Sequence, residues 1–572
     1  MKNYQIAQIF NQYADLLEIK NDNPFKIRAY RRASQNLEGL TEDIEKLTRE
    51  NRLQEIPGIG KDLAEKIKEF VNKGKISSFE ELRKTVPEGV LKMLEIPGVG
   101  PKTAKMFYEK LGIKSIEELE KLAREHKLSG LPGLKDKTEE NILKGIELIK
   151  NKRKRMLLGN ALPLADSIIA SLKNLKEVKR ITYAGSLRRM KETIRDIDIL
   201  ITSTHPEKVM GYFVKLPQVK EVLAKGSTKS SILTHEGIQV DLRVVEPDNF
   251  GSCLLYFTGS KQHNIHLRTL AQKMGFKVSE YGVFEERTNR NLARGKEEAE
   301  IYKILGLSYI PPELREDLGE IEAAQKGELP QLVELKDIKG DLHVHSDWSD
   351  GAHSLEELAE EGIRRGYEYL AITDHSQSLG IARGLNEERL LQQIKEIKKI
   401  NQKLKNFRLL CGTEVDIRKD GSLDLDSKVL EKMDIVVAAL HTGFRQSKEE
   451  LTKRVIRAFE SGLVDIFAHP SGRLLGEREA YELDYEAIFK VAKEKKVCLE
   501  INSYPQRLDL TDINSRSAKN YGITLAINTD THNIGQLDYL RLGIAVARRG
   551  WLEKRDILNC LPLKELLKKL NK

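Results

Sequence analysis

The feature that most constrains the fold is a run of seven short apolar segments after residue 337. They read DLHVH, YLAITDH, LLCGTE, DIVVAALH, VDIFAH, VCLEIN and TLAINTDTH, and helical stretches separate most of them. Buried strands that alternate with helices predict a parallel sheet that closes into a barrel. Six of the seven segments end in His, Asp or Glu. Barrels of this kind carry their chemistry at the C-terminal ends of the strands, so we expect a site there.

Six histidines lie at or just past the ends of these predicted strands, and His353 is the exception. A lone histidine at a strand end is more often a core residue than a ligand, but six that converge with three carboxylates are hard to explain structurally. Mixed imidazole and carboxylate ligands suit Zn²⁺ or Mn²⁺, and nine of them suit three ions. The predicted ligands are His343, His345, Asp350, His375, Glu414, His441, His469, Asp530 and His532.

A second constraint is the predicted strand Arg195-Asp-Ile-Asp-Ile-Leu200. Asp196 and Asp198 point to one face of such a strand, since side chains alternate along it. Asp is a poor strand residue, so a solvated edge strand is the simplest interpretation of the pair alone. Asp241 in GIQVDLRVV adds a third acid on a second strand. Three carboxylates on adjacent strands can hold two Mg²⁺ or Mn²⁺ ions about 3.5–4 Å apart.

The segment before these acids contains a small-residue turn, Gly185-Ser186, followed by Arg189. Such a turn and a guanidinium together suit a triphosphate.

Residues 1 to about 150 are predicted to be helical and contain a repeat: IPGIGKDLAEKI from Ile56, IPGVGPKTAKMF from Ile96 and a degraded LPGLKDKTEENI from Leu131. Two glycines before a helix give a tight turn and leave N–H groups free for a phosphate. One copy is as often mere turn chemistry, but two resemble helix-hairpin-helix motifs, which bind the DNA backbone without reading sequence. The glycines concerned are Gly58, Gly60, Gly98 and Gly100.

Composition excludes several classes of protein. At 572 residues the chain is too long for one core, so we expect three to five modules. The sequence has no run of eighteen apolar residues and no signal or transit pattern, which predicts a cytoplasmic protein with no membrane contact. The four cysteines are far apart and fit reduced thiols better than disulfides. A net charge of +9 is mild for this length.

The Gly-Ser, Asp-x-Asp and Asp set, followed by Tyr256-Phe-Thr-Gly-Ser260, resembles the family X DNA polymerases over roughly residues 1–316. The resemblance implies that Asp196, Asp198 and Asp241 are catalytic metal ligands. It also implies that Gly185, Ser186 and Arg189 bind the incoming triphosphate. By the same resemblance Tyr256, Phe257 and Gly259 line the sugar pocket, Asn264 contacts the base in the minor groove and Arg268 the template strand.

The first helical module is similar to the DNA-end-binding domain of that family. Phe25-Lys26-Ile-Arg-Ala-Tyr30 matches its DNA-end segment, which implies DNA contacts for Lys26 and Tyr30. Lys66 falls where animal members carry a lysine that forms a Schiff base with deoxyribose phosphate. However, Asp62 stands where those members have a supporting lysine, so a plain surface role for Lys66 is an equal alternative.

The C-terminal part resembles the PHP (polymerase and histidinol phosphatase) domain, whose motifs HVHSDWSDG, TDH, GTEVD, ALH, AHP and NTDTH occur in order over residues 337–572. The resemblance implies a distorted barrel of seven strands, and its chemistry is metal-dependent hydrolysis of phosphoesters. Arg507 and Arg383 could add phosphate contacts or be ordinary surface charges.

The expected fold is multidomain, α+β and α/β. It comprises helix-hairpin-helix domains, a nucleotidyltransferase palm, a thumb and a distorted (β/α)7 barrel. The expected boundaries are 1–85 (DNA-end-binding), 86–150 (fingers-type), 151–247 (palm), 248–317 (nucleotide selection and thumb), 318–336 (linker, without a clear apolar face) and 337–572 (PHP).

The expected function is a monomeric DNA-directed DNA polymerase that fills short gaps in base-excision repair. The barrel is expected to act as a 3′-5′ exonuclease, and cleavage at abasic sites is a second activity expected of the same site. Expected partners are gapped or nicked DNA and deoxynucleoside triphosphates (dNTPs). Two alternatives stay open: a phosphoesterase for small phosphomonoesters with a DNA-binding half, and a non-catalytic repair scaffold.

Overall fold

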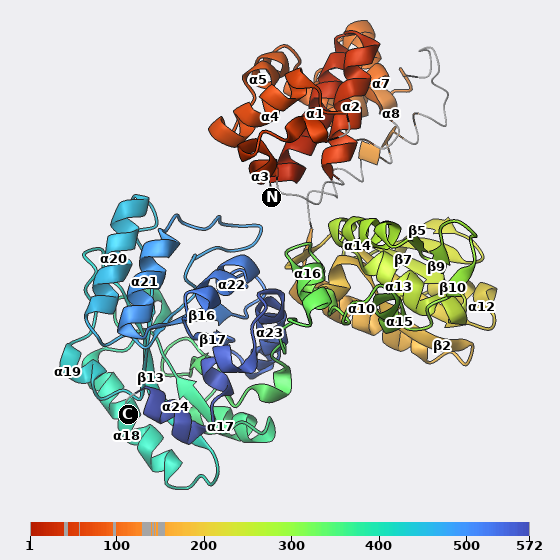
Figure 1. The fold of residues 1–572 in the computed structure, drawn as a ribbon. Coiled ribbons are helices and arrows are strands. Elements are labelled where there is room, and N and C mark those ends of the chain that lie inside the picture. Colours follow the sequence, from red (N-terminus) through yellow and green to blue (C-terminus); the bar gives the residue numbers. More distant parts are fainter. Residues whose placement is uncertain are drawn as a thin grey trace. The chain divides into compact units, whose positions relative to one another are not determined.

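The computed structural model describes residues 2–38, 44–56, 58–94, 96, 99–128, 139, 142–143, 145–146 and 155–570 (Figure 1). The chain divides into two compact units, Met1–Arg155 with Lys261–Lys273, and Met156–Ser260 with Met274–Lys572. Gly98 and residues 131–138 of the third sequence repeat lie outside the described residues. Among the helices that are described, none is long and apolar enough to cross a membrane.

The first unit is helical in its described part. Glycines mark its helix ends: Gly60 and Gly100 are N-caps, whereas Gly74 and Gly112 adopt the left-handed conformation that closes a helix. Its helices are α1 (Lys2–Ile19), α2 (Pro24–Glu38), α3 (Ile44–Arg49), α4 (Lys61–Lys73), α5 (Ser77–Lys84), α6 (Glu88–Met93), α7 (Pro101–Leu111), α8 (Ile116–Arg124) and α14 (Lys261–Lys273).

The second unit begins with a five-stranded sheet of order β2-β4-β7-β6-β5, in which β4 and β7 are parallel and the other pairs antiparallel. Its strands are β2 (Val178–Tyr183), β4 (Asp196–Ser203), β5 (Val219–Lys225), β6 (Lys229–Thr234) and β7 (Gln239–Val244). Ile197, Ile199 and Ile201 of β4 are buried in one core with α10 (Leu158–Lys173) and α12 (Pro206–Phe213). Because side chains alternate, Asp196 and Asp198 face the opposite side.

That opposite side carries α11 (Gly185–Arg188) and α13 (Phe250–Thr258), and Leu200 packs there against Phe250 and Leu254. Smaller elements complete this region: β1 (Met156–Leu157) pairs with β3 (Thr193–Ile194), and a three-stranded sheet leads to α15. The elements of that sheet and the helix are β8 (Phe276–Ser279), β9 (Gly282–Glu285), β10 (Asn291–Ala293) and α15 (Glu298–Ile304).

Seven parallel strands follow one another in sequence order, as the sequence predicts. They are β11 (Gly340–Val344), β12 (Tyr369–Ile372), β13 (Arg408–Asp416), β14 (Ile435–Ala439), β15 (Ile466–Phe467), β16 (Cys498–Asn502) and β17 (Leu525–Asn528). The first and last strands meet where the His345 N–H donates to the Thr531 carbonyl at 2.8 Å and the Thr531 N–H to that of His343 at 3.3 Å. The barrel is therefore nearly closed.

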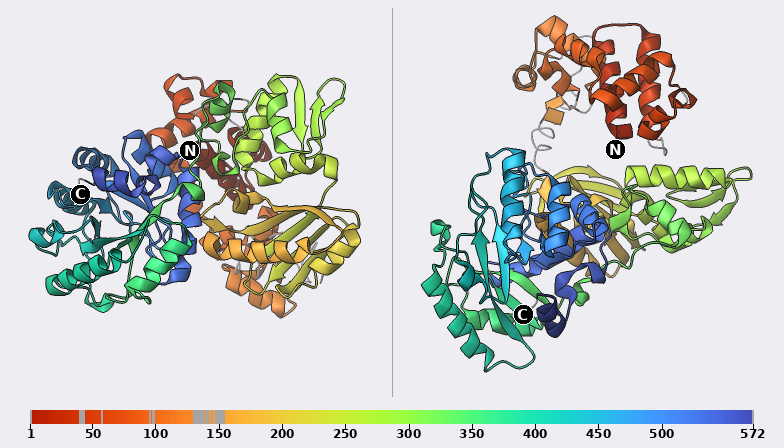
Figure 2. Two further views of the ribbon diagram at one scale, coloured as in Figure 1. Left: turned by 90° about the horizontal axis from the view of Figure 1, so that it is seen from below. Right: turned by 60° about the vertical axis from the view of Figure 1, so that its left-hand side comes forward.

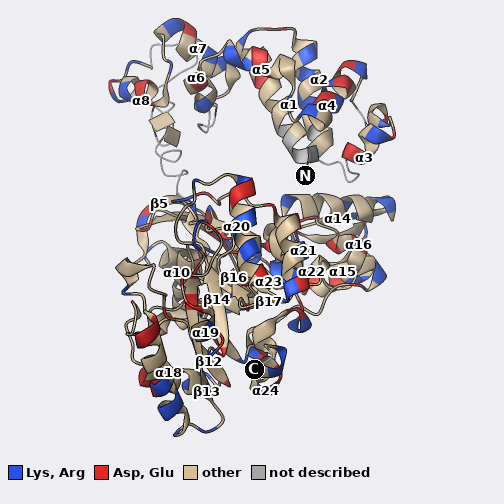
Figure 3. Cartoon of the chain, turned by 90° about the vertical axis from the view of Figure 1, so that its left-hand side faces the viewer, with Lys and Arg blue, Asp and Glu red and all other residues tan. Residues whose placement is uncertain are grey.

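The barrel helices lie outside the strands in both views of Figure 2. They are α17 (Leu355–Arg364), α18 (Glu387–Asn401), α19 (Ser427–Leu430), α20 (Lys448–Glu460), α21 (Tyr485–Lys495), α22 (Asp512–Asn520), α23 (Leu540–Arg549) and α24 (Leu563–Lys569). Strands such as β12 and β14 are wholly buried, and in Figure 3 the charged residues gather on helices such as α18. This is the hydrophobic pattern that a parallel barrel requires.

The expectation that residues 318–336 lack an apolar face is wrong. The segment forms α16 (Glu320–Lys326), and Ile321, Ala324 and Val333 are buried. Glu320 is also buried. Its charge is tolerated there because its carboxylate accepts hydrogen bonds from the backbone N–H groups of Asp317 and Leu318 at 2.9 and 2.7 Å. The acids that suggested a solvated linker are in part capping groups of a packed helix.

Buried and partly buried ion pairs join Glu192 and Glu316 to the barrel within the second unit. Arg549 of α23 contacts Asp512 and Glu316, and its side chain is only 3% exposed. Arg473, which follows β15, binds the Glu192 carboxylate through two nitrogens at 3.1 and 2.6 Å. Removing one partner of such a pair leaves a buried charge uncompensated, which is costly.

We expect Arg549→Met to lower the free energy of unfolding of the second unit by about 3–5 kcal/mol, because Asp512 loses its buried cation while Glu316 keeps Arg189. Urea unfolding monitored by circular dichroism measures the change. The matched control is Arg541→Met, whose pair with Asp166 spans 3.6 Å with both side chains more than 40% exposed. The control should cost less than about 1 kcal/mol, and equal losses would contradict the prediction.

Candidate functional site

The strand pairing brings the three predicted palm carboxylates to one face of the sheet. In the parallel pair of β4 and β7, Asp198 lies directly opposite Asp241, and Asp196 lies opposite Gln239. Asp241 is 8% exposed. Cations already lie against two of the acids: Lys229 Nζ is 3.2 Å from Asp241, and Arg195 is 3.0 Å from Asp196.

The electrostatics of this face favour bound cations. Burial raises the pKa of Asp198 to about 6, and the charges of Asp196 and Asp241 add to the effect. For Asp241, burial acts to raise the pKa, but hydrogen bonds from Gln239, Ser231 and Lys229 outweigh it and lower the pKa. Oxygen ligands that repel one another are the donor set that Mg²⁺ or Mn²⁺ suits, so the residues present fit such ions.

Gly185 shapes this face because the turn that it forms touches Asp198. Its φ is +61°, and an added Cβ would lie 2.6 Å from Asp198 Oδ2. The sequence-based expectation that a small-residue turn is needed here has this physical basis. Ser186 follows in the same turn and is partly exposed.

Arg189 is held by protein groups. Its Nε donates to Glu316 at 2.9 Å, and its Nη1 donates to the Thr258 carbonyl. Its side chain is 13% exposed. A triphosphate contact from Arg189 therefore stays a prediction, and it would require the guanidinium to share or exchange these partners.

The predicted sugar-pocket residues lie at the end of α13. Tyr256 is 37% exposed and meets Phe257 edge-on with ring centroids 5.1 Å apart. Arg243 covers the Phe257 ring at 4.4 Å. Gly259 follows with a φ of +67°. Asn264 and Arg268 lie on α14 of the first unit, where Arg268 Nε donates to the Asn264 carbonyl at 3.2 Å.

The structure corrects one expected DNA contact in the first unit. Tyr30 is 1% exposed and stacks on Tyr13 with ring centroids 4.3 Å apart, so its ring belongs to the core. Lys26 is exposed, and an ion pair of 3.5 Å joins it to Asp22. Lys66 Nζ is 2.6 Å from Asp62, an ion pair that a Schiff base would have to break.

The helix-hairpin-helix glycines that are described lie at helix starts. Gly58 has a φ of +80°, a conformation that other residues rarely adopt. Gly60 and Gly100 cap α4 and α7, and nothing lies within 4 Å of a Cβ added to either. The ends of both helices are therefore open to a phosphate.

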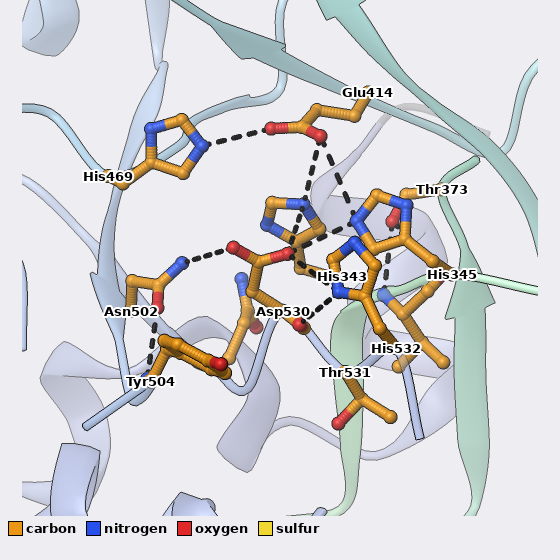
Figure 4. Close-up of polar contacts among 12 residues, drawn as sticks. His343, His345, Thr373, Glu414, His469, Asn502, Tyr504, Asp530, Thr531 and His532 are labelled. Atoms are coloured by element: carbon orange, nitrogen blue, oxygen red, sulfur yellow. Dashed lines mark hydrogen bonds and ion pairs between the residues drawn. The ribbon is translucent and has the colours of Figure 1, made fainter. Parts of the chain in front are cut away.

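The barrel rim brings the predicted ligands together (Figure 4). Ligand atoms within 4.8 Å of one another form three groups, and His345 and His375 each belong to two of them. His469 Nε2 lies 3.0 Å from Glu414, a member of the third group. The groups are His345, Asp350, His375 and His532; His343, His345 and Asp530; and His375, Glu414 and His441.

Several of these buried atoms make no hydrogen bond. Buried polar atoms are almost always paired, so a concentration of unpaired nitrogens indicates ligands for a metal. Both ring nitrogens of His345 are fully buried and make no hydrogen bond, and the Asp530 carboxylate lies 3.2 Å from Nε2, so the rim fits divalent ions. The other buried atoms here without a hydrogen bond include His343 Nε2, His441 Nδ1 and His469 Nδ1, whereas His375 Nδ1 and Glu414 Oε2 lie 2.7 Å apart as an ion pair.

The charges at the rim set the protonation of the ligands. Burial lowers the pKa of His345 to about 3, and His375 and His532 add to this. Burial acts against the charge of His441, but Glu414 and Asp416 raise its pKa to about 10. A metal that binds His441 must therefore displace a proton near neutral pH.

Comparisons with known proteins agree with this geometry. The chain matches the DNA polymerase beta thumb over residues 253–316 and the PHP domain over residues 341–504. It also matches a helix-hairpin-helix domain over residues 1–76 and a SAM-like helix-hairpin-helix tandem over residues 90–147.

One relative is similar over nearly its whole length. It is the DNA polymerase/3′-5′ exonuclease PolX of Bacillus subtilis, 41% identical over 568 residues, which are 99% of each chain. The chain belongs to the family X DNA polymerases that carry a PHP domain. DNA polymerase lambda of Rattus norvegicus is 26% identical over 46% of this chain and 48% of its own. A probable phosphatase of Syntrophotalea carbinolica is 35% identical over 28% of this chain and 65% of its own.

Glu500 is a residue of this family X chain that the sequence-based ligand set missed. It is fully buried on β16 and accepts from His343 Nδ1 at 2.8 Å and from the His469 N–H at 2.8 Å. Asn502 and Asn528 donate to it at 3.1 and 3.0 Å. A carboxylate behind a ligating imidazole fixes the ring and its tautomer. Its signal in the sequence is a glutamate inside the apolar segment VCLEIN.

The two arginines considered for phosphate binding differ in place. Arg507 Nε is 3.6 Å from Asp530 Oδ2, so the guanidinium lies beside a predicted ligand. Arg383 is exposed, and among the described residues its side chain makes no hydrogen bond or ion pair with the rim. Arg507 is thus the better placed of the two.

The shared ligands predict unequal losses of metal. We expect His345→Ala to remove two bound ions because His345 belongs to two groups, and His441→Ala to remove one. Metal content after dialysis, measured by mass spectrometry, gives the stoichiometry, and His353→Ala is the control outside the groups. Equal loss in the first two variants, or loss in the control, would contradict the assignment.

Proposed function

We propose that the chain is a DNA-directed DNA polymerase joined to a metal-dependent 3′-5′ exonuclease, acting on short gaps in DNA repair. One observation carries the proposal: two separate sets of acidic or imidazole ligands lie on two different sheets of the second unit. The relative that matches 99% of the chain is named for the same two activities.

In the polymerase site, Asp196, Asp198 and Asp241 would hold two Mg²⁺ or Mn²⁺ ions. Ions so held favour the ionised 3′-hydroxyl and stabilise the leaving pyrophosphate. Asp198, with a pKa of about 6, is ionised at neutral pH and lies against the Gly185 turn. Tyr256 and Phe257, whose rings meet edge-on, would contact the sugar of the dNTP.

In the exonuclease site, the nine rim ligands would hold three divalent ions, Zn²⁺, Mn²⁺ or both. Such ions supply a hydroxide nucleophile at neutral pH and neutralise the phosphate oxygens. Glu500 holds His343 in one orientation through its Nδ1 atom. Arg507 is placed to bind a phosphate oxygen beside Asp530.

The helix-hairpin-helix glycines support gapped or nicked DNA as the substrate. Gly60 and Gly100 are the N-caps of α4 and α7, and a helix N-terminus suits a phosphate. Base-excision repair and cleavage at abasic sites are proposals that follow from gap filling. The domain boundaries, the monomeric state and a cytoplasmic location stay predictions. The Lys66–Asp62 ion pair speaks against deoxyribose-phosphate lyase activity, which we do not propose.

The test is one assay on a gapped, end-labelled primer, with and without dNTPs. We expect Asp198→Ala to abolish extension and to leave degradation intact, because Asp198 is a metal ligand of the palm alone. His345→Ala should abolish degradation and leave extension within about twofold. Losses from removing a metal ligand should exceed about 100-fold.

Two outcomes would overturn the proposal. Rapid cleavage of phosphomonoesters with an inert primer would indicate a phosphatase with a DNA-binding half. Binding of gapped DNA with no addition and no degradation, in either Mg²⁺ or Mn²⁺, would indicate a scaffold.

The contact between Gly185 and Asp198 gives a further prediction. Gly185→Ala should lower the kcat of nucleotide addition by about 100-fold, because its Cβ would displace the Asp198 carboxylate. Gly237→Ala is the matched control, since Gly237 also has a positive φ but nothing lies within 4 Å of an added Cβ. Primer extension measures both. A similar loss in the two variants would show that backbone strain, not the carboxylate, is responsible.

A further inference from the structure

Tyr504 stands at the mouth of the barrel beside the predicted metal ligands. It follows β16 by two residues, and its N–H donates to Asn502 Oδ1 at 3.0 Å. The Asn502 amide in turn donates to Asp530 at 3.1 Å. Figure 4 shows the Tyr504 ring next to Asn502 at the edge of the ligand cluster. The ring is partly exposed, so it is accessible to a molecule that enters the site.

The backbone around this ring is fixed on both sides. Ser503 and Pro505 are buried, and each lies against a glycine. A Cβ added to Gly543 would lie 2.0 Å from Ser503 Oγ, and a Cβ added to Gly159 would lie 2.7 Å from Pro505 Cβ. The two neighbours are therefore clamped by close packing while Tyr504 itself is left partly open.

The ring is also supported from its side. Tyr539, which packs against the hydrophobic core, meets Tyr504 nearly perpendicularly, with centroids 5.7 Å apart and an interplanar angle of 83°. An edge-to-face contact of this kind holds an aromatic ring without covering both of its faces. A rigid ring with few rotatable bonds loses little entropy when a ligand stacks on it.

Arg507 lies at a fixed place relative to the ring. Its N–H donates to the Tyr504 carbonyl at 2.8 Å, and its guanidinium lies 3.6 Å from Asp530. Arg473 supports the same turn, because its Nε donates to the Arg507 carbonyl at 2.9 Å. The same turn thus carries an aromatic ring and a cation three residues apart, a combination that suits the base and the phosphate of one nucleotide.

We propose that Tyr504 forms a base-stacking subsite for the terminal nucleobase of an unpaired DNA 3′ end. The inference rests on the proposed exonuclease and names how that site holds its substrate. A stacking ring suits an enzyme that removes any nucleotide, because every base has a π-face and the contact reads no sequence. Tyr504 is a positioning residue for the base, and the bond that breaks lies at the metal ligands.

The test compares two single-stranded substrates that differ only at the 3′ end, one with a normal nucleotide and one with an abasic analogue. Tyr504→Ala should lower kcat/KM on the normal end by about tenfold to a hundredfold, mainly through KM. On the abasic end the same variant should act within about twofold of the unchanged protein, because no base is there to stack. Tyr504→Phe should keep activity on both ends, since the ring remains.

The matched control is Tyr521→Ala. Tyr521 is also a partly exposed tyrosine with one aromatic neighbour, Phe489, at 5.5 Å, but it precedes β17 at the opposite end of the barrel. It should change neither substrate. An equal fall on normal and abasic ends in Tyr504→Ala, or no fall on the normal end, would overturn the subsite.

A binding measurement separates this inference from the proposed function. An oligonucleotide with a 3′-terminal 2-aminopurine, bound to the His345→Ala variant, should lose fluorescence by stacking. Adding Tyr504→Leu should restore the fluorescence, whereas adding Tyr521→Leu should not. Quenching that depends on Tyr504, together with no degradation of the primer by the unchanged protein, would support the subsite and overturn the proposed function. Quenching unchanged by Tyr504→Leu would overturn the subsite.

Discussion

The barrel rim buries charged ligands, and the strands around it have to keep those charges compensated. Glu414 and Asp530 are buried among imidazoles whose nitrogens largely lack hydrogen-bond partners. Burial opposes the charge of Glu414, yet His375 and His441 hold its pKa well below the usual range. A buried charge is tolerated only where opposite charges compensate it, so the barrel rim is stable as a set and not residue by residue.

The scaffold answers this constraint with apolar strands and a second layer of polar groups. Leu499 and Ile501 flank Glu500 on β16, and all three are buried, so the carboxylate is held where only His343 and a few amides reach it. In the palm, too, buried apolar residues of a strand hold a carboxylate in place. Ile197 and Ile199 anchor β4 in the core, and the alternation of the strand leaves Asp198 on the open face.

Much of this arrangement could be predicted from the sequence. The seven strands and their order follow from apolar segments that alternate with helices, and the rim ligands follow from the ends of those segments. The DNA contact expected of Tyr30 is wrong, because a motif match does not say which side of a helix faces the core. The expectation that residues 318–336 form a solvated linker is wrong, because Glu320 caps a helix instead of facing solvent. Glu500 was missed because its role exists only when β11 and β16 meet across the barrel.

The ion pairs between the five-stranded sheet and the barrel bear on how one DNA end could serve two sites. Glu192 lies between the Gly185 turn and Asp196, and Arg473 joins it to the turn that carries Arg507. Segments next to both sites are thus connected through a partly buried ion pair, which favours one arrangement because any other leaves the two charges unpaired. A 3′ end that changes sites then has to move by itself, by separating from its template. A stacking ring at the barrel mouth suits such an unpaired end, because it replaces the base stacking that the strand gives up.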